Sequence, residues 1–178
     1  MNRTTFYIAA CALVGFALLL TAATATAADS YRIAVTRVSD GDTVRGRKLA
    51  VKGNPEVRIR LYGIDAPETK GRTWDAQPGG KESSTFLRHM LPVGDVVTVN
   101  VVDVDRYKRD VAILTMQDGR VVQEELLRYG HAWVYPQYCK ISRCEYWRSL
   151  ESEAKAARRG LWHKRNATPP WEWRKGVR

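Results

Sequence analysis

Histidine and cysteine are scarce in this chain of 178 residues, with three of each. The histidines, His89, His131 and His163, do not show the short paired spacing with cysteine or histidine that zinc sites use. A zinc centre is therefore not expected. Length and composition, with 44% hydrophobic residues and 10% aromatic ones, predict one globular domain rather than a disordered chain.

Acidic residues are also in the minority, 19 against 29 Lys and Arg, which leaves a net charge of +10. Such an excess argues against chemistry on neutral small molecules. It favours an anionic partner, because phosphate backbones and anionic lipids both attract clustered Lys and Arg.

Long apolar runs are absent after residue 28. Before it, Arg3 is the only charge, residues 6–20 are apolar, and small residues end in Ala25-Thr26-Ala27. This layout predicts a signal peptide over residues 1–27, and its cleavage would leave a chain that is secreted or periplasmic without stable membrane association. The alternative is an uncleaved anchor, which the short apolar run and the adjacent A-x-A site disfavour.

Cys11 would leave with the signal peptide, so Cys139 and Cys144 remain as an isolated pair. Two cysteines in an exported chain most simply form one disulfide. A metal site would need further ligands, which the sequence around them does not offer.

Strand patterns come first and helical patterns later. Alternation of apolar and polar residues predicts strands at 31–36, 43–51, 57–62, 96–104 and 109–116. Helical spacing predicts helices at 81–91, 121–129 and 147–161. Five such strands with about three helices predict an α+β, mainly β, domain over 30–163: a five-stranded OB-type barrel with packed helices, followed by a basic tail over 164–178.

Three polar segments fall at the ends of these strands. They are 40–43 (DGDT), 60–69 (RLYGIDAPET) and 105–109 (DRYKR). Taken singly, each fits an ordinary turn or a solvated arginine. Together they supply carboxylates for a hard cation, arginines for phosphate oxygens and a carboxylate to activate water, which are the parts of a phosphodiesterase.

These segments, in this order, resemble the signature segments of the staphylococcal nuclease family, and the resemblance spans about residues 31–162. It implies a barrel of the same kind that cleaves DNA and RNA with Ca²⁺, with little sequence preference, in single-stranded or frayed regions. The products would carry 3′-phosphates. Separately from the resemblance, we expect the protein to act as a monomer.

The resemblance also implies a role for each residue that matches a family motif. Asp42, Asp65 and the carbonyl of Ala66 would bind Ca²⁺, Glu68 would activate water, and Arg60 and Arg109 would hold the scissile phosphate. Arg106 and Tyr107 would contact a neighbouring phosphate, and Tyr135 would stack on a base. Two positions depart from the family pattern: Lys108 stands where Gly is common, and Ala66 replaces Thr.

The tail adds Arg174, Lys175 and two tryptophans, Trp171 and Trp173. They could clamp a single strand by stacking, but Thr168-Pro169-Pro170 reads as a linker and favours a solvated, partly disordered tail. Two other functions remain open: a non-catalytic OB module that binds nucleic acid or protein, and a membrane-surface protein with a basic helix. The full set Asp42, Arg60, Asp65, Glu68 and Arg109 favours the enzyme, because a pure binder has no need of all five.

Overall fold

The computed structural model describes residues 30–71 and 75–177. The predicted signal peptide, residues 1–27, lies outside the described residues. Among the residues that are described, no helix has the length and apolar character needed to cross a bilayer.

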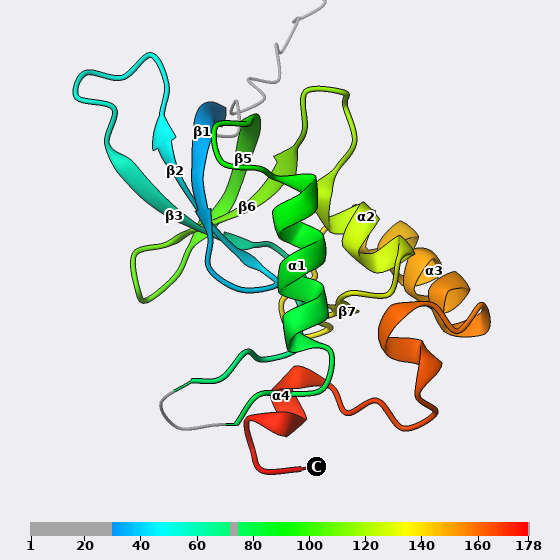
Figure 1. Cartoon of the computed structure of the whole chain (residues 1–178). Helices are drawn as coiled ribbons and strands as arrows, with labels where there is room; N and C mark the ends of the chain where they lie inside the picture. The colour runs from blue at the N-terminus through cyan, green and yellow to red at the C-terminus, as the bar shows by residue number, and fades with distance from the viewer. Residues whose placement is uncertain (1–29, 72–74, 178) are drawn as a thin grey trace, which may run out of the picture.

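Five strands close into a barrel, which confirms the predicted fold class (Figure 1). The strands are β1 (Ser30–Val38), β2 (Thr43–Lys48), β3 (Glu56–Leu61), β5 (Val96–Val104) and β6 (Asp110–Thr115). Their order around the barrel is β1-β2-β3-β6-β5. Only the β3–β6 pair in this barrel is parallel, and it brings the end of β3 beside the start of β6.

Alternation in the sequence sets which side chains fill the barrel. In β1 and β3, Ile33, Val35, Ile59 and Leu61 are at most 2% exposed, whereas the residues between them face outward or are half-buried. The prediction for the second strand was too long, since β2 ends at Lys48 rather than residue 51. The chain leaves the sheet there because Ala50 takes a positive φ of 57°.

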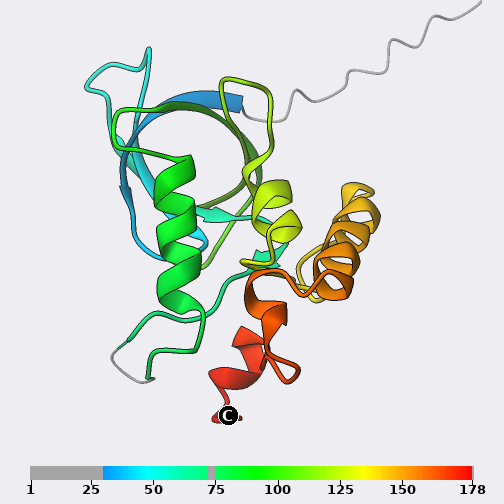
Figure 2. The same ribbon diagram turned by 45° about the vertical axis from the view of Figure 1, so that its right-hand side comes forward.

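Three helices pack beside the barrel: α1 (Gly80–Met90), α2 (Val122–Arg128) and α3 (Arg143–Ala156). Figure 2 shows the barrel as a ring with α1 in front of it and α2 and α3 to one side. Gln123 joins α2 to β6, because its amide donates to the Ala112 carbonyl at 2.8 Å and accepts the Leu114 N–H at 3.3 Å.

The last helix is displaced from its predicted position. It begins at Arg143 rather than residue 147 and ends at Ala156 rather than residue 161, and a 3-10 turn, η1 (Gly160–His163), follows it. Arg158 and Gly160 both take positive φ, 52° and 50°, which a continuous right-handed helix does not allow.

Three further elements were not predicted. The short strands β4 (Ile64–Asp65) and β7 (Trp133–Val134) pair with each other, and helix α4 (Pro170–Trp173) forms in the tail. The preference for a solvated tail was wrong, because Trp173 is only 9% exposed and its indole Nε1–H donates to the Asp75 carbonyl at 3.1 Å. Figure 1 shows α4 beside the loop that leads into α1.

Candidate active site

The turn between β1 and β2 presents Asp42. The Asp40 carboxylate accepts the Asp42 N–H at 3.1 Å and shapes this turn. Gly41 lies so near the loop after β4 that an added Cβ would come within 2.7 Å of the Ala66 Cβ. The turn therefore packs directly against that loop, and Asp42 is only 3% exposed.

Asp65 is held beneath the same turn by the β4–β7 ladder, in which it pairs with Trp133. Its side chain is fully buried. The Asp42 carboxylate also accepts the Ala66 N–H at 2.8 Å. Two predicted metal ligands, 23 positions apart in the sequence, thus lie at one place.

Arg60 joins these two carboxylates. It is the penultimate residue of β3, opposite Thr43, and its guanidinium donates one N–H to Asp42 and another to Asp65, the latter at 2.6 Å. Burial acts to lower the pKa of Arg60, but the adjacent carboxylates of Asp42 and Asp65 outweigh it and hold that pKa above its usual value.

The pKa of Asp42 is raised well above its ordinary value because the carboxyl is buried, although the Arg60 charge acts in the opposite direction. Burial therefore disfavours the charged form of Asp42. An additional cation nearby would stabilise its charged form.

Glu68 lies in the loop that follows Asp65. Gln77 fixes the backbone of Glu68 by two hydrogen bonds. The side-chain oxygen of Gln77 accepts the Glu68 N–H at 3.1 Å, and the backbone N–H of Gln77 donates to the Glu68 carbonyl at 2.8 Å. Burial raises the pKa of the Glu68 carboxyl, and Arg174 opposes that shift. A raised pKa suits a group that accepts a proton from water.

Arg174, from the tail, is the functional candidate that sequence reasoning missed. Its guanidinium pairs with Asp65 at 2.9 Å and also donates to Glu68. The sequence showed Arg174 only as one charge in a basic stretch, and no local pattern relates it to residues more than 100 positions earlier. Together these five side chains form a carboxylate cluster: Asp42, Arg60, Asp65, Glu68 and Arg174.

Arg109 is held differently from the other predicted catalytic residues. Asp105 accepts its guanidinium Nε–H at 2.6 Å and also accepts its backbone N–H at 3.0 Å. In the described part of the chain, no hydrogen bond or ion pair joins Arg109 to the carboxylate cluster. Arg109 does precede β6 directly, and β6 begins with Asp110 opposite Ile59, one residue before Arg60.

The turn before Arg109 contains the departure at Lys108, which takes a positive φ of 58°. Glycine adopts this conformation without strain, and lysine does not. In the same turn, Arg106 and Tyr107 are exposed, and the Arg106 guanidinium donates to the Tyr107 hydroxyl at 2.7 Å. Both side chains are free to meet a ligand from solvent.

Tyr135 follows β7, and its ring is stacked on Trp171 with centroids 4.9 Å apart and planes 9° from parallel. Tyr138 packs edge-on against the same ring. Cys139 and Cys144, just beyond, form a disulfide.

The carboxylate cluster suits a hard cation by its chemistry. Asp42 and Asp65 lie close enough to share the guanidinium of Arg60, and carboxylates and carbonyls offer oxygen atoms only. Among residues 30–71 and 75–177, no three His, Cys, Asp or Glu side chains form a ready ligand set, so water or backbone oxygens would have to complete the shell.

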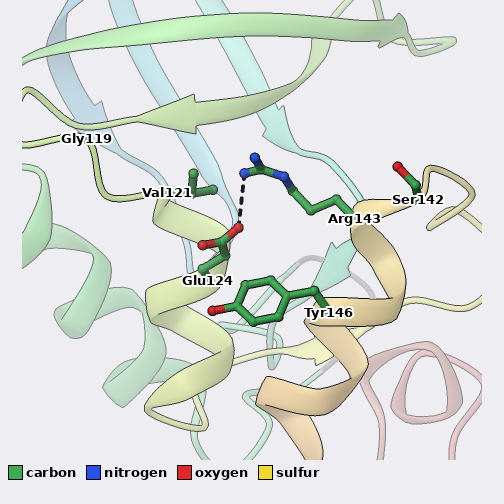
Figure 3. A pocket seen from close by; sticks show the side chains of 6 residues that line it. All are labelled: Gly119, Val121, Glu124, Ser142, Arg143 and Tyr146. Carbon is green, nitrogen blue, oxygen red and sulfur yellow. Dashed lines mark hydrogen bonds and ion pairs between the residues drawn. The ribbon is translucent and has the colours of Figure 1, made fainter.

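A cavity of about 540 Å³ lies elsewhere, between α2 and α3 (Figure 3). Its lining includes Glu124, Arg143 and Tyr146, with an Arg143–Glu124 ion pair of 3.0 Å. None of the predicted site residues lines it. This cavity is therefore not the candidate active site.

Comparison with known proteins agrees with the geometry. Residues 58–164 match the model of the family described as "Staphylococcal nuclease homologue". The chain is 37% identical over 140 residues to an "Uncharacterized endonuclease" of Escherichia coli O157:H7, covering 79% of this chain and 82% of the relative. It is 42% identical over 121 residues to "Staphylococcal-like nuclease CAN1" of Arabidopsis thaliana, covering 68% of this chain but 34% of that protein.

A third relative is an "Uncharacterized 38.1 kDa protein" of Capnoides sempervirens, 41% identical over 121 residues. The alignment covers 68% of this chain and 32% of that relative. The chain thus spans about a third of the length of these two plant relatives.

Proposed function

This chain belongs to the staphylococcal nuclease homologue family and carries its nuclease domain, and we propose that it is a Ca²⁺-dependent endonuclease. It would hydrolyse phosphodiester bonds of DNA and RNA with little sequence preference and leave 3′-phosphate ends. The observation that carries the proposal is the carboxylate cluster, in which Asp42, Arg60 and Asp65 meet beside Glu68.

Each residue has a defined task in this proposal. Asp42 and Asp65 would hold Ca²⁺, with the Ala66 carbonyl as a further oxygen, and the ion would supply positive charge at the reacting phosphate. Glu68 would accept the proton of the attacking water.

Arg60 and Arg109 would each donate N–H groups to the phosphate oxygens as charge builds on them. Asp105 aligns Arg109 by holding its Nε–H, which leaves the two terminal nitrogens for the substrate. Arg106, Tyr107 and Tyr135 would contact the neighbouring nucleotide by charge and stacking.

We also propose that the protein is exported and acts as a monomer outside the cytoplasm. The pattern of residues 1–27 supports export, and the Cys139–Cys144 disulfide suits an oxidising compartment.

The test is degradation of denatured DNA by the purified chain in Ca²⁺ and in EGTA, with Arg60→Ala beside it and analysis of the new ends. We expect calcium-dependent cleavage that leaves 3′-phosphates and that the variant lacks. If both proteins bind the DNA and neither cleaves it with any divalent metal, the chain is a binding module of this fold and the proposal fails.

A further inference from the structure

The tail, residues 164–177, is folded back onto the body of the protein at several places. The Gln77 amide donates to the Thr168 carbonyl at 2.5 Å, and Trp173 binds the Asp75 carbonyl through its indole. Both tail residues help to line a cavity of about 440 Å³ with Gln77 and His131. These contacts fix the short helix α4 over the loop that carries Glu68.

From this position the tail occupies two parts of the site at once. Arg174 pairs with Asp65 and Glu68, so a guanidinium covers oxygens that a metal ion and an attacking water would need. Trp171 covers one face of Tyr135, and rings stacked this closely leave no room for a base between them. A cation and a flat ring thus stand where a bound metal and a nucleobase would stand.

We propose that residues 169–174 are an internal competitor of metal and substrate, and that the structure shows the closed form. This inference rests on the proposed function. Single-stranded nucleic acid and a divalent cation would open the site by displacing Trp171 and Arg174. A site that is open for only part of the time binds its ligand more weakly in proportion to that part.

The electrostatics of the tail support a contact that can be exchanged. Arg174 is still 29% exposed at its side chain. Its partner Asp65 also pairs with Arg60, whose charge acts on Glu68 as well. A metal ion that replaced the Arg174 guanidinium would leave no carboxylate of the cluster unpaired. Arg174 itself would return to solvent, where a guanidinium is stable.

The test for Arg174 is calorimetric titration of the chain with Ca²⁺ alone. Arg174→Gln should bind Ca²⁺ about 10-fold more tightly than the unaltered chain, because the competitor is lost. Lys175→Gln is the matched control, since Lys175 follows α4 and, among the described residues, pairs with Glu172 at 3.1 Å and with no member of the carboxylate cluster, and it should leave the affinity unchanged. Equal or weaker Ca²⁺ binding by Arg174→Gln would overturn the proposal.

Trp171 is tested separately with a single-stranded phosphorothioate oligonucleotide that is not cleaved. Trp171→Ala should bind it several-fold more tightly if Trp171 blocks Tyr135. Weaker binding would make Trp171 part of a clamp for the substrate and would refute its role as a competitor. If the unaltered chain cleaves DNA while neither variant gains affinity, the tail proposal fails and the proposed function stands.

A second inference comes from the outer face of the barrel. Arg45 in β2 lies directly opposite Arg37 in β1 and Arg58 in β3, so three arginines form a row across the sheet. Like charges in directly opposite positions destabilise a sheet. Among the described residues only Arg45 of this row has a carboxylate partner, Glu56 at 3.4 Å.

The row lies next to the candidate site. Arg58 is two residues before Arg60 on the same face of β3, about 7 Å away along the strand. We infer that Arg37, Arg45 and Arg58 bind the phosphate backbone of a nucleic acid strand that runs on from the reacting phosphate. This inference also rests on the proposed function.

The test compares Arg37→Gln/Arg58→Gln with a control on the helices, Arg88→Gln/Arg148→Gln. For a long single strand, the first pair should lower the slope of log K against log salt by about 1.4, because each phosphate contact contributes about 0.7 on a single strand. It should raise KM for that strand and leave hydrolysis of a dinucleotide unchanged. An unchanged salt slope would overturn the inference, whereas failure of the unaltered chain to cleave either substrate would overturn the proposed function instead.

Discussion

The carboxylate of Asp42 accepts the backbone N–H of Ala66 at 2.8 Å, although 24 residues separate the two in the sequence. This bond fastens the β1–β2 turn to the loop that carries Glu68. The same carboxylate pairs with Arg60, so one side chain both positions the loop and balances the buried guanidinium.

The substitution Asp42→Asn separates these two roles, because an amide oxygen can still accept the Ala66 N–H while the negative charge is gone. Burial already disfavours the charged carboxyl, so we expect the free energy of unfolding without Ca²⁺ to fall by no more than about 1 kcal/mol. We also expect Ca²⁺ to raise the melting temperature of the unaltered chain but not of the variant. Equal calcium-induced shifts in thermal denaturation would contradict the metal-ligand role.

Glu68→Gln should slow hydrolysis of denatured DNA by a factor of about 10²–10⁴, because an amide cannot accept the proton of water. Binding of a phosphorothioate strand should change little, as the exchange removes no aromatic or cationic contact. Turnover close to that of the unaltered chain would remove Glu68 from the chemistry.

Asp105 should make stability depend on pH. Its burial acts to raise its pKa, but the N–H groups of Arg109 and Tyr107 outweigh this and hold the pKa of the folded chain below the ordinary value. The unfolded chain therefore binds the proton more readily. The stabilisation is present above the ordinary aspartate pKa and is lost as pH falls through the lower, folded value.

Asp105→Asn should accordingly cost about 1 kcal/mol of unfolding free energy at pH 7, and the deficit should shrink below about pH 4. Urea denaturation across this range measures it. Asp118→Asn is the control, because Asp118 also pairs with an arginine, Arg120, but its side chain is 50% exposed and should matter much less. A deficit for Asp105→Asn that does not vary with pH would rule out this linkage.

Lys108→Gly should raise the free energy of unfolding by about 1 kcal/mol, because Lys108 has a φ of 58° that glycine adopts freely. The gain is partly offset by the greater freedom of glycine in the unfolded chain. Thermal denaturation measures the change, and a lower melting temperature would show that the lysine side chain stabilises the turn more than its backbone strain destabilises it.

Much of the fold could be predicted because its signals are local. Ile33 and Val35 alternate with outward residues, so the sequence itself records which face of β1 is buried. The motifs around Asp42, Asp65 and Glu68 were recognisable because each is a short run of adjacent residues. The predicted ends of the second strand and of the last helix were less accurate. The positive φ angles at Ala50 and Arg158, which follow these ends, do not change the hydrophobic periodicity of the sequence.

The sequence by itself determined that this chain forms a basic β-barrel with carboxylates and arginines at its strand ends. Only the tertiary structure decided that Asp105 holds Arg109 and that Arg174 reaches Asp65 and Glu68. The reason is physical: hydrophobic periodicity reflects burial within one element, whereas an ion pair between residues 109 positions apart depends on how the whole chain closes.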